Sequence, residues 1–165
     1  MSRAVLSLGS NLGDRLGFLR LAVDGLRDAL VAVSAVYETE PWGVSDQPDF
    51  LNAVCIVDDP ARDHWAWLRA GQELERRAER VREQRWGPRT LDVDVVTVDD
   101  VRSEDPELLL PHPGTPERAT VLIPWLEIDP HAEVPGHGSV AGLLAALPRA
   151  DRDGVRRLPE LTLLP

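Results

Sequence analysis

Residues 91–98 read LDVDVVTV, and this valine-rich stretch decides the fold class because it predicts a strand that completes a regular series of elements. Before it, residues 61–80 carry apolar side chains at helical spacing, and residues 51–57 are an apolar run typical of a buried strand. The polar segment 81–90 joins this helix to the last strand. Residues 91–98 are therefore the last element of a series that runs strand (51–57), helix (61–80), strand (91–98).

The N-terminal part of the chain has a similar pattern. Residues 4–8 predict a strand that ends in the turn GSNLG, and apolar residues from Leu16 to Leu30 recur at helical spacing after a helix cap at Asp14. Residues 33–39 then predict another strand. The order is β-α-β-β-α-β. We expect an α+β, ferredoxin-like sandwich with two helices on one face of a mainly antiparallel sheet.

The C-terminal third gives weaker signals. Residues 108–113 and 121–128 are apolar, and residues 139–147 predict a short helix. Residues 148–165 have no periodicity, so we interpret them as a tail. A chain of 165 residues has the usual length of one domain. We therefore expect one domain formed by residues 1–147, to which 148–165 is appended.

The charge composition excludes several classes of function. The chain has 18 basic and 28 acidic side chains, a net charge of −10, and every basic residue is an arginine. An acidic chain repels phosphate backbones and anionic lipids, so we expect neither nucleic-acid nor membrane binding. The absence of lysine excludes a Walker-A phosphate loop and Schiff-base chemistry.

The location of the protein is predicted from what the sequence lacks. No apolar run approaches the roughly 18 residues of a membrane span, and the N-terminal apolar stretch is too short for a signal peptide. The single cysteine, Cys55, lies in an apolar run and is interpreted as a buried hydrophobic residue. We expect a cytoplasmic protein.

Arginines gather between residues 76 and 89, where six arginines and two glutamates give a local charge of +4. Arginine forks bind phosphate oxygens bidentately and stay charged at any working pH, so this segment is suited to a polyphosphate. The alternative is a solvated helix end, where the helix dipole favours arginines. The six are Arg76, Arg77, Arg80, Arg82, Arg85 and Arg89.

Asp92 and Asp94 follow this segment directly on the predicted strand. Residues two apart on a strand point to the same face, roughly 7 Å apart, and two neighbouring carboxylates are unfavourable without a cation. Carboxylates of this kind suit Mg²⁺ together with substrate phosphates. The alternative is an exposed sheet face, but metal next to arginine is the combination that polyphosphate transfer requires.

Other candidate residues carry less information singly. The turn GSNLGDR at 9–15 precedes a helix and is able to present backbone amides to an anion, or is simply a capped strand-to-helix turn. Trp42 and Trp86 lie in Pro- and Gly-containing loops and are suited to cover a flat heterocycle. His112 lies between two prolines, and Asn52 lies among apolar strand residues, where a buried amide needs partners.

Together these motifs resemble the 6-hydroxymethyl-7,8-dihydropterin pyrophosphokinases of folate biosynthesis over about residues 4–147. The block RWGPRTLDVD is highly specific for that family, and the GSNLG turn is moderately so. The similar segments are 8–14 (LGSNLGD), 37–43 (YETEPWG), 47–53 (QPDFLNA), 80–82 (RVR), 85–94 (RWGPRTLDVD) and 111–113 (PHP).

The resemblance implies a ferredoxin-like fold and diphosphate transfer from ATP to the pterin hydroxymethyl oxygen, with release of AMP and with two Mg²⁺ ions. It implies that Asp92 and Asp94 hold the metals, while Arg80 and Arg89 meet the transferring phosphates. We add Asp94 as the group that helps the acceptor proton to leave. The implied ATP contacts are Gln72, Glu75, Arg82, His112 and Arg118, and the implied pterin contacts are Thr39, Trp42, Phe50, Asn52 and Trp86.

Two positions depart from the family. Thr120 stands where the family usually has an aromatic residue that stacks on the pterin, and Gly114 replaces a residue that is often basic. Thr120 motivates a second hypothesis, a Mg-ATP phosphotransferase with another acceptor. A third is a nucleotide-sensing module without turnover, which leaves the paired aspartates unexplained. We expect a monomer, and the resemblance makes dihydropteroate synthase a candidate neighbour.

Overall fold

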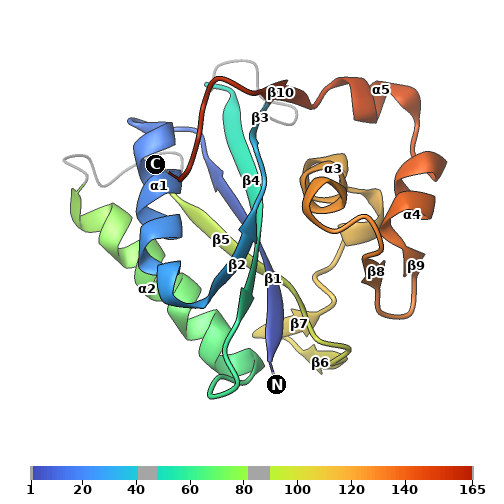
Figure 1. The fold of residues 1–165 in the computed structure, drawn as a ribbon, viewed down its shortest axis with the longest axis horizontal. Coiled ribbons are helices and arrows are strands. Elements are labelled where there is room, and N and C mark those ends of the chain that lie inside the picture. The colour runs from blue at the N-terminus through green and yellow to red at the C-terminus, as the bar shows by residue number, and fades with distance from the viewer. Residues whose placement is uncertain (1, 41–47, 82–89, 165) are drawn as a thin grey trace.

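The computed structural model describes residues 2–40, 48–81 and 90–164, with the side chains of residues 80 and 81 excepted. Its centre is one antiparallel sheet with the strand order β10-β3-β4-β1-β5, and β2 also pairs with β4 (Figure 1). The expected mixture of helices with a mainly antiparallel sheet is confirmed. The strands are β1 (Arg3–Ser10), β2 (Leu30–Val33), β3 (Val36–Thr39), β4 (Phe50–Asp58), β5 (Asp92–Val98) and β10 (Arg156–Leu158).

Both faces of the sheet are buried, because its central strands are apolar at successive positions. In β1, Ala4, Leu6 and Leu8 belong to one hydrophobic cluster, whereas Val5 belongs to a second cluster on the opposite face. Strand β4 alternates in the same way, with Cys55 in the first cluster. The sheet therefore separates two cores.

Two helices cover the first face, α1 (Arg15–Gly25) and α2 (His64–Val81) (Figure 1). Asp14 caps α1 by accepting a hydrogen bond from the Gly17 N–H at 3.0 Å, as its sequence position predicts. Asp63 caps α2 by accepting one from the Ala66 N–H at 2.8 Å. The fully buried Trp67 anchors α2 in the first core.

Two further helices cover the second face, α3 (Ala119–Ile128) and α4 (Val140–Ala146). Val121, Leu122, Trp125 and Val140 from these helices pack on the second cluster, opposite α1 and α2 (Figure 1). The sequence predicts two helices on one face and a short helix at 139–147, which α4 confirms, but it does not predict α3 or a second covered face. The difference arises because the apolar segment 121–128 forms a helix and buries the valines on the other side of the sheet.

Two element boundaries predicted from the sequence are wrong. The helical spacing extends to Leu30, but α1 ends at Gly25 and a 3-10 turn at Arg27–Ala29 leads into β2. The predicted strand 33–39 is divided into β2 and β3, because Ser34 bonds to both backbone groups of Val54 and Glu127 accepts from the Ala35 N–H.

The tail has a defined conformation. It forms α5 (Arg149–Asp153) and β10, and Leu163 enters the first core. None of the helices in the described ranges is long and apolar enough to cross a membrane. The remaining short elements are β6 (Ser103–Asp105), β7 (Leu108–Leu110), a 3-10 turn at Thr115–Glu117, β8 (Glu133–Val134) and β9 (Gly138–Ser139).

Candidate functional site

Asp92 and Asp94 lie at the start of β5, where the second face of the sheet is not covered by α3 and α4. Val96, two residues further along the same face, is buried in the second cluster, while the Asp94 side chain is 45% exposed. Val93 and Val95 between them face the first core. The strand therefore places both carboxylates on one accessible face, as the Asp-x-Asp spacing predicts.

The sheet register aligns this carboxylate pair with Asn52. Gly9 of β1 pairs with Asp92 on one side and with Asn52 of β4 on the other. A Cβ atom at Gly9 would lie 3.4 Å from the Asn52 Oδ1 atom, so the glycine leaves the face open beside the amide. The amide and the carboxylates thus lie two strands apart, roughly 10 Å, on one face.

Asn52, Gly9 and Asp92 form a row across the three adjacent strands β4, β1 and β5. A cavity of about 630 Å³ lies at the Asn52 end of this row. Its walls include Thr39, Phe50 and Asn52, and the Asn52 Nδ2 atom donates a hydrogen bond to Thr39 Oγ1 at 2.9 Å. Three of the five residues that the resemblance implies for the pterin therefore line one cavity. Arg118 and Thr120 line it as well, so one implied ATP residue lies next to the implied pterin residues.

His112 lies beside the carboxylate pair. Its Nε2 atom is 4.0 Å from the Asp94 Oδ1 atom, and its backbone N–H donates to the Val96 carbonyl at 2.9 Å. The Nδ1 atom lies 3.0 Å from the Pro113 carbonyl oxygen. These contacts keep the imidazole next to the Asp94 end of the row. The sequence singled out His112 and Asp94 separately, and the structure brings them together.

Glu75 and Gln72 both lie on α2, and Glu75 reaches the strand that carries the aspartates. The Glu75 Oε2 atom accepts a hydrogen bond from the Val93 N–H at 2.9 Å, which satisfies a backbone donor between the two aspartates. Gln72 accepts one from Arg69 Nη1 at 3.0 Å. Glu75 therefore supports the strand that carries the carboxylates, whereas Gln72 bonds within its own helix.

Several predicted site residues lie outside the described part of the chain. These are Trp42, Arg82, Trp86 and Arg89, and for Arg80 the structure gives only the backbone, in the last turn of α2. Of the remaining cluster, Arg76 and Arg77 pair with Glu73 at 3.0 and 3.7 Å. These two arginines fit the alternative of a solvated helix end.

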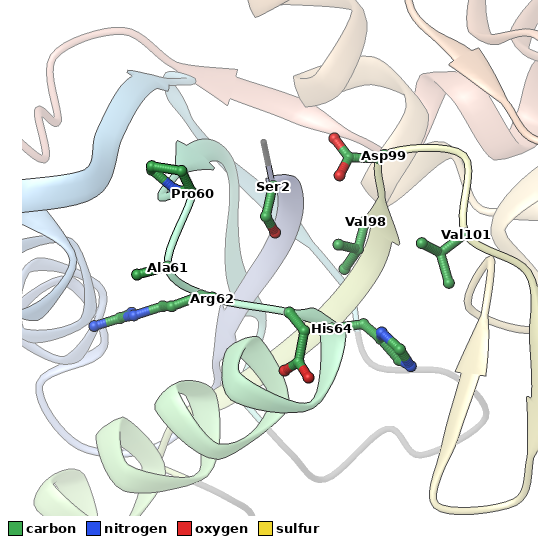
Figure 2. A pocket seen from close by; sticks show the side chains of 9 residues that line it. Ser2, Pro60, Ala61, Arg62, His64, Val98, Asp99 and Val101 are labelled. Atoms are coloured by element: carbon green, nitrogen blue, oxygen red, sulfur yellow. The ribbon is translucent and has the colours of Figure 1, made fainter.

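A second cavity, of about 480 Å³, lies at the opposite end of β1 and β5 (Figure 2). Several of its polar groups have partners: Arg62 pairs with Asp59 and lies over the Trp67 ring, and Asp99 accepts a hydrogen bond from the Arg3 N–H. Ser2 accepts one from the Trp67 Nε1 atom. Within the described ranges, no group of three or more histidine, cysteine or acidic side chains forms a metal site.

The sequence missed a charged cluster beside the first cavity. Arg156 of β10 donates to Glu38 and Asp49 at 3.0 and 3.1 Å, and Arg15 bonds to the same two residues. The hydrogen bond from Arg156 and, more weakly, that from Arg15 hold the pKa of Glu38 below its usual range, against the opposing effect of burial. Asp151 of α5 also lines the cavity. No motif marks the tail, so only its pairing with β3 reveals these residues.

Solved structures with the same fold include chains named HPPK-DHPS from Plasmodium falciparum. One of them, a triple mutant with pteroate, has a TM-score of 0.68 and 15% identity and covers 94% of this chain. Another, the triple mutant with SDX-DHP, has a TM-score of 0.65 and covers 87%. This chain spans 44–46% of the length of those two proteins. At this identity the likeness concerns the fold alone.

Sequence comparison identifies the family. Residues 5–130 match the family model of 7,8-dihydro-6-hydroxymethylpterin-pyrophosphokinase. Proteins named 2-amino-4-hydroxy-6-hydroxymethyldihydropteridine pyrophosphokinase are similar along most of the chain. The one from Mycobacterium leprae is 53% identical and covers 99% of this chain and 92% of its own; the one from Mycobacterium bovis is 52% identical over 94% and 89%. These matches confirm the resemblance drawn from the motifs, and the chain belongs to the 7,8-dihydro-6-hydroxymethylpterin-pyrophosphokinase family.

Proposed function

We propose that this protein transfers the diphosphate of ATP to the hydroxymethyl oxygen of 6-hydroxymethyl-7,8-dihydropterin, giving AMP and the pterin diphosphate in folate biosynthesis. Pyrophosphokinase activity follows from family membership. One observation supports placing this reaction at the sheet face: Asn52, Gly9 and Asp92 form a row across three adjacent strands. It joins a cavity suited to a heterocycle to a carboxylate pair suited to a metal.

The pterin is assigned to the cavity beside Asn52. An amide offers both a donor and an acceptor, which suits the polar edge of a pterin, and Phe50 offers an apolar surface for the ring. Thr39 fixes the amide through its hydrogen bond from Asn52 Nδ2. Trp42 and Trp86 are proposed as further pterin contacts from the family resemblance.

Asp92 and Asp94 are proposed to hold two Mg²⁺ ions. The donor set fits, because magnesium takes one or two carboxylates together with water and substrate phosphates. When bound, the ions neutralise and align the phosphates of ATP. The two carboxylates share one accessible face, and this arrangement supports the assignment.

The nucleotide is assigned to the side of the row that carries His112. Gln72, Glu75, Arg82, His112 and Arg118 are the proposed ATP contacts. Arg80 and Arg89 are proposed to stabilise charge on the transferring group, which arginines do in phosphoryl transfer. Asp94 is proposed to accept the hydroxyl proton of the pterin as the new bond forms.

A product analysis tests this function. Purified protein is mixed with ATP, Mg²⁺ and 6-hydroxymethyl-7,8-dihydropterin, and AMP, ADP and pterin diphosphate are quantified. We expect pterin-dependent AMP in a ratio of one to one with the diphosphate ester. ADP would instead indicate transfer of a single phosphoryl group, and ATP binding without AMP would indicate a sensing module.

The Asp94→Ala variant tests the metal assignment in the same assay. We expect turnover to fall by more than about 10²-fold, because metal stabilisation of developing charge is worth several kcal/mol. Circular dichroism is the control for folding, since the side chain is partly exposed. Full activity in a folded variant would remove Asp94 from the metal site.

A second candidate function is a Mg-ATP phosphotransferase with a different alcohol as acceptor. Thr120 favours it, because this half-buried residue lines the cavity but has no ring with which to stack. Turnover of another alcohol, with none of the pterin, would establish this alternative.

The proposal also covers the fold type, the domain organisation, the location and the association of the protein. The order β5-β1-β4 followed by β2 and β3, with α1 and α2 on one face, supports a ferredoxin-like core. Residues 1–147 and the tail are proposed to act as one domain, as a cytoplasmic monomer. Loose association with dihydropteroate synthase is also proposed, supported by the fusion named HPPK-DHPS in Plasmodium falciparum.

A further inference from the structure

The C-terminal tail adds an edge strand next to the cavity. Strand β10 pairs antiparallel with β3, and Arg156 lies opposite Glu38 in the register. The tail lies beyond residues 5–130, which match the family model. In Figure 1, β10 and α5 lie along the same end of the molecule as β3. The tail is therefore in contact with the strand that carries Thr39.

Arg156 connects two residues that are distant in sequence. Its Nη2 atom donates to Glu38 Oε1 at 3.0 Å and to Asp49 Oδ2 at 3.1 Å. Arg15 reinforces the connection, because its Nη1 atom donates to Glu38 Oε2 at 3.2 Å and to the Asp49 carbonyl at 2.7 Å. Two cations and two anions thus form one network that joins β10, β3, the start of α1 and the residue before β4.

Both anions directly precede residues that line the cavity. Glu38 precedes Thr39, and Asp49 precedes Phe50, and Thr39 and Phe50 are register partners between β3 and β4. A shift of Glu38 relative to Asp49 moves one wall of the cavity against the other. It also moves Thr39, which holds the Asn52 amide.

We propose that Arg156 is a positioning residue for the pterin cavity: it holds Glu38 and Asp49 together so that Thr39 and Phe50 keep their spacing. The proposal rests on the proposed function, since it takes the pterin as the ligand of this cavity. An isolated surface ion pair contributes little to stability. Its effect on binding is larger, because a site is sensitive to displacements well below 1 Å.

The test compares Arg156→Ala with Arg157→Ala. Arg157 is the next residue on β10, is about as exposed, and pairs with Glu127 at 4.0 Å instead of with Glu38 or Asp49. We expect Arg156→Ala to raise the pterin Kd and KM about fivefold or more. The KM for ATP and the denaturant midpoint should match those of Arg157→Ala. Arg156→Lys should restore part of the affinity, because an ammonium is able to reach one carboxylate.

Pterin Kd is measured by equilibrium titration, separately from turnover. If Arg156→Ala and Arg157→Ala bind the pterin equally, or if Arg156→Ala changes stability and both KM values in parallel, the positioning role is overturned while the proposed function stands. If the wild-type protein binds no pterin at all, the proposed function fails, and this inference fails with it. Asp49→Asn should reproduce the selective loss.

Discussion

Thr120 stands at the position where the resemblance to the family predicts an aromatic residue. It lines the same cavity as Thr39, Phe50 and Asn52, and it is partly buried. An aromatic ring here is expected to stack on the pterin and to add about 1 kcal/mol beyond its buried area. We predict that Thr120→Phe lowers the pterin Kd about fivefold.

Thr120→Leu is the matched control for this prediction, because leucine adds apolar volume without a ring. Fluorescence titration with the pterin compares the three proteins. A Kd that falls equally in both variants would attribute the gain to volume alone. A Kd that is unchanged or higher in Thr120→Phe would mean that the stacking position is already filled.

Glu38 makes the stability of the protein depend on pH in the acidic range. Its hydrogen bonds with Arg156 and Arg15 lower its pKa from the ordinary value of 4.5, so the unfolded chain binds the proton more readily than the folded chain does. The resulting stabilisation is present above that ordinary value and is lost as the pH falls through the lowered pKa of the folded state. We predict that Glu38→Gln lowers the urea midpoint at about pH 7, and that the difference from wild type shrinks below about pH 4.

Urea unfolding of both proteins across this range measures the difference directly. Asp24→Asn serves as the comparison, because Asp24 forms an exposed pair with Arg27 in which the aspartate side chain is 72% exposed. That variant should differ little from wild type at any pH. A constant gap between wild type and Glu38→Gln down to about pH 3 would contradict the assigned cause.

Helix α2 owes its position to one buried face. Trp67, Gly71, Leu74 and Ala78 recur at helical spacing and are all buried. Trp67 is fully buried, and its Nε1 atom donates to Ser2 Oγ at 2.9 Å. We predict that Trp67→Ala lowers the free energy of unfolding by about 3–5 kcal/mol through the cavity it leaves. Denaturant unfolding measures this change. The control is Trp65→Ala, which should lose clearly less free energy of unfolding because Trp65 is only partly buried.

The sequence predicts this helix and part of its buried face. Of the apolar residues that it places at helical spacing, Leu74 and Ala78 are buried in the core, whereas Trp65 and Leu68 are only partly buried. The fully buried Trp67 is missed. Apolar residues occur on two sides of α2, so periodicity alone does not tell which side packs inward. The strands are predicted more reliably, because a strand that is buried on both faces is apolar at every position, as in residues 53–57.

The sequence predicts single residues of the candidate site, but it does not predict that Asn52, Gly9 and Asp92 align across three strands. Asp92 and Asp94 are found from their spacing, and Asn52 from its apolar surroundings. Their alignment through Gly9 depends on the register of three strands, which no local pattern specifies. Arg156 is missed for the same reason, because β10 is recognised only by its pairing with β3.

The whole molecule has two cores, one on each face of the sheet. The rate at which the single cysteine is chemically modified measures how often the sheet between them opens. Cys55 lies in the middle of β4 with no exposed surface, and burial raises the pKa of its thiol to about 12. A thiol reagent reaches a neutral, buried thiol only when the sheet opens. We predict that a thiol-specific reagent modifies the folded protein at least about 10³-fold more slowly than the urea-unfolded chain. Rates measured at increasing urea should rise along the unfolding curve, and rapid, complete modification without denaturant would contradict a sheet buried on both faces.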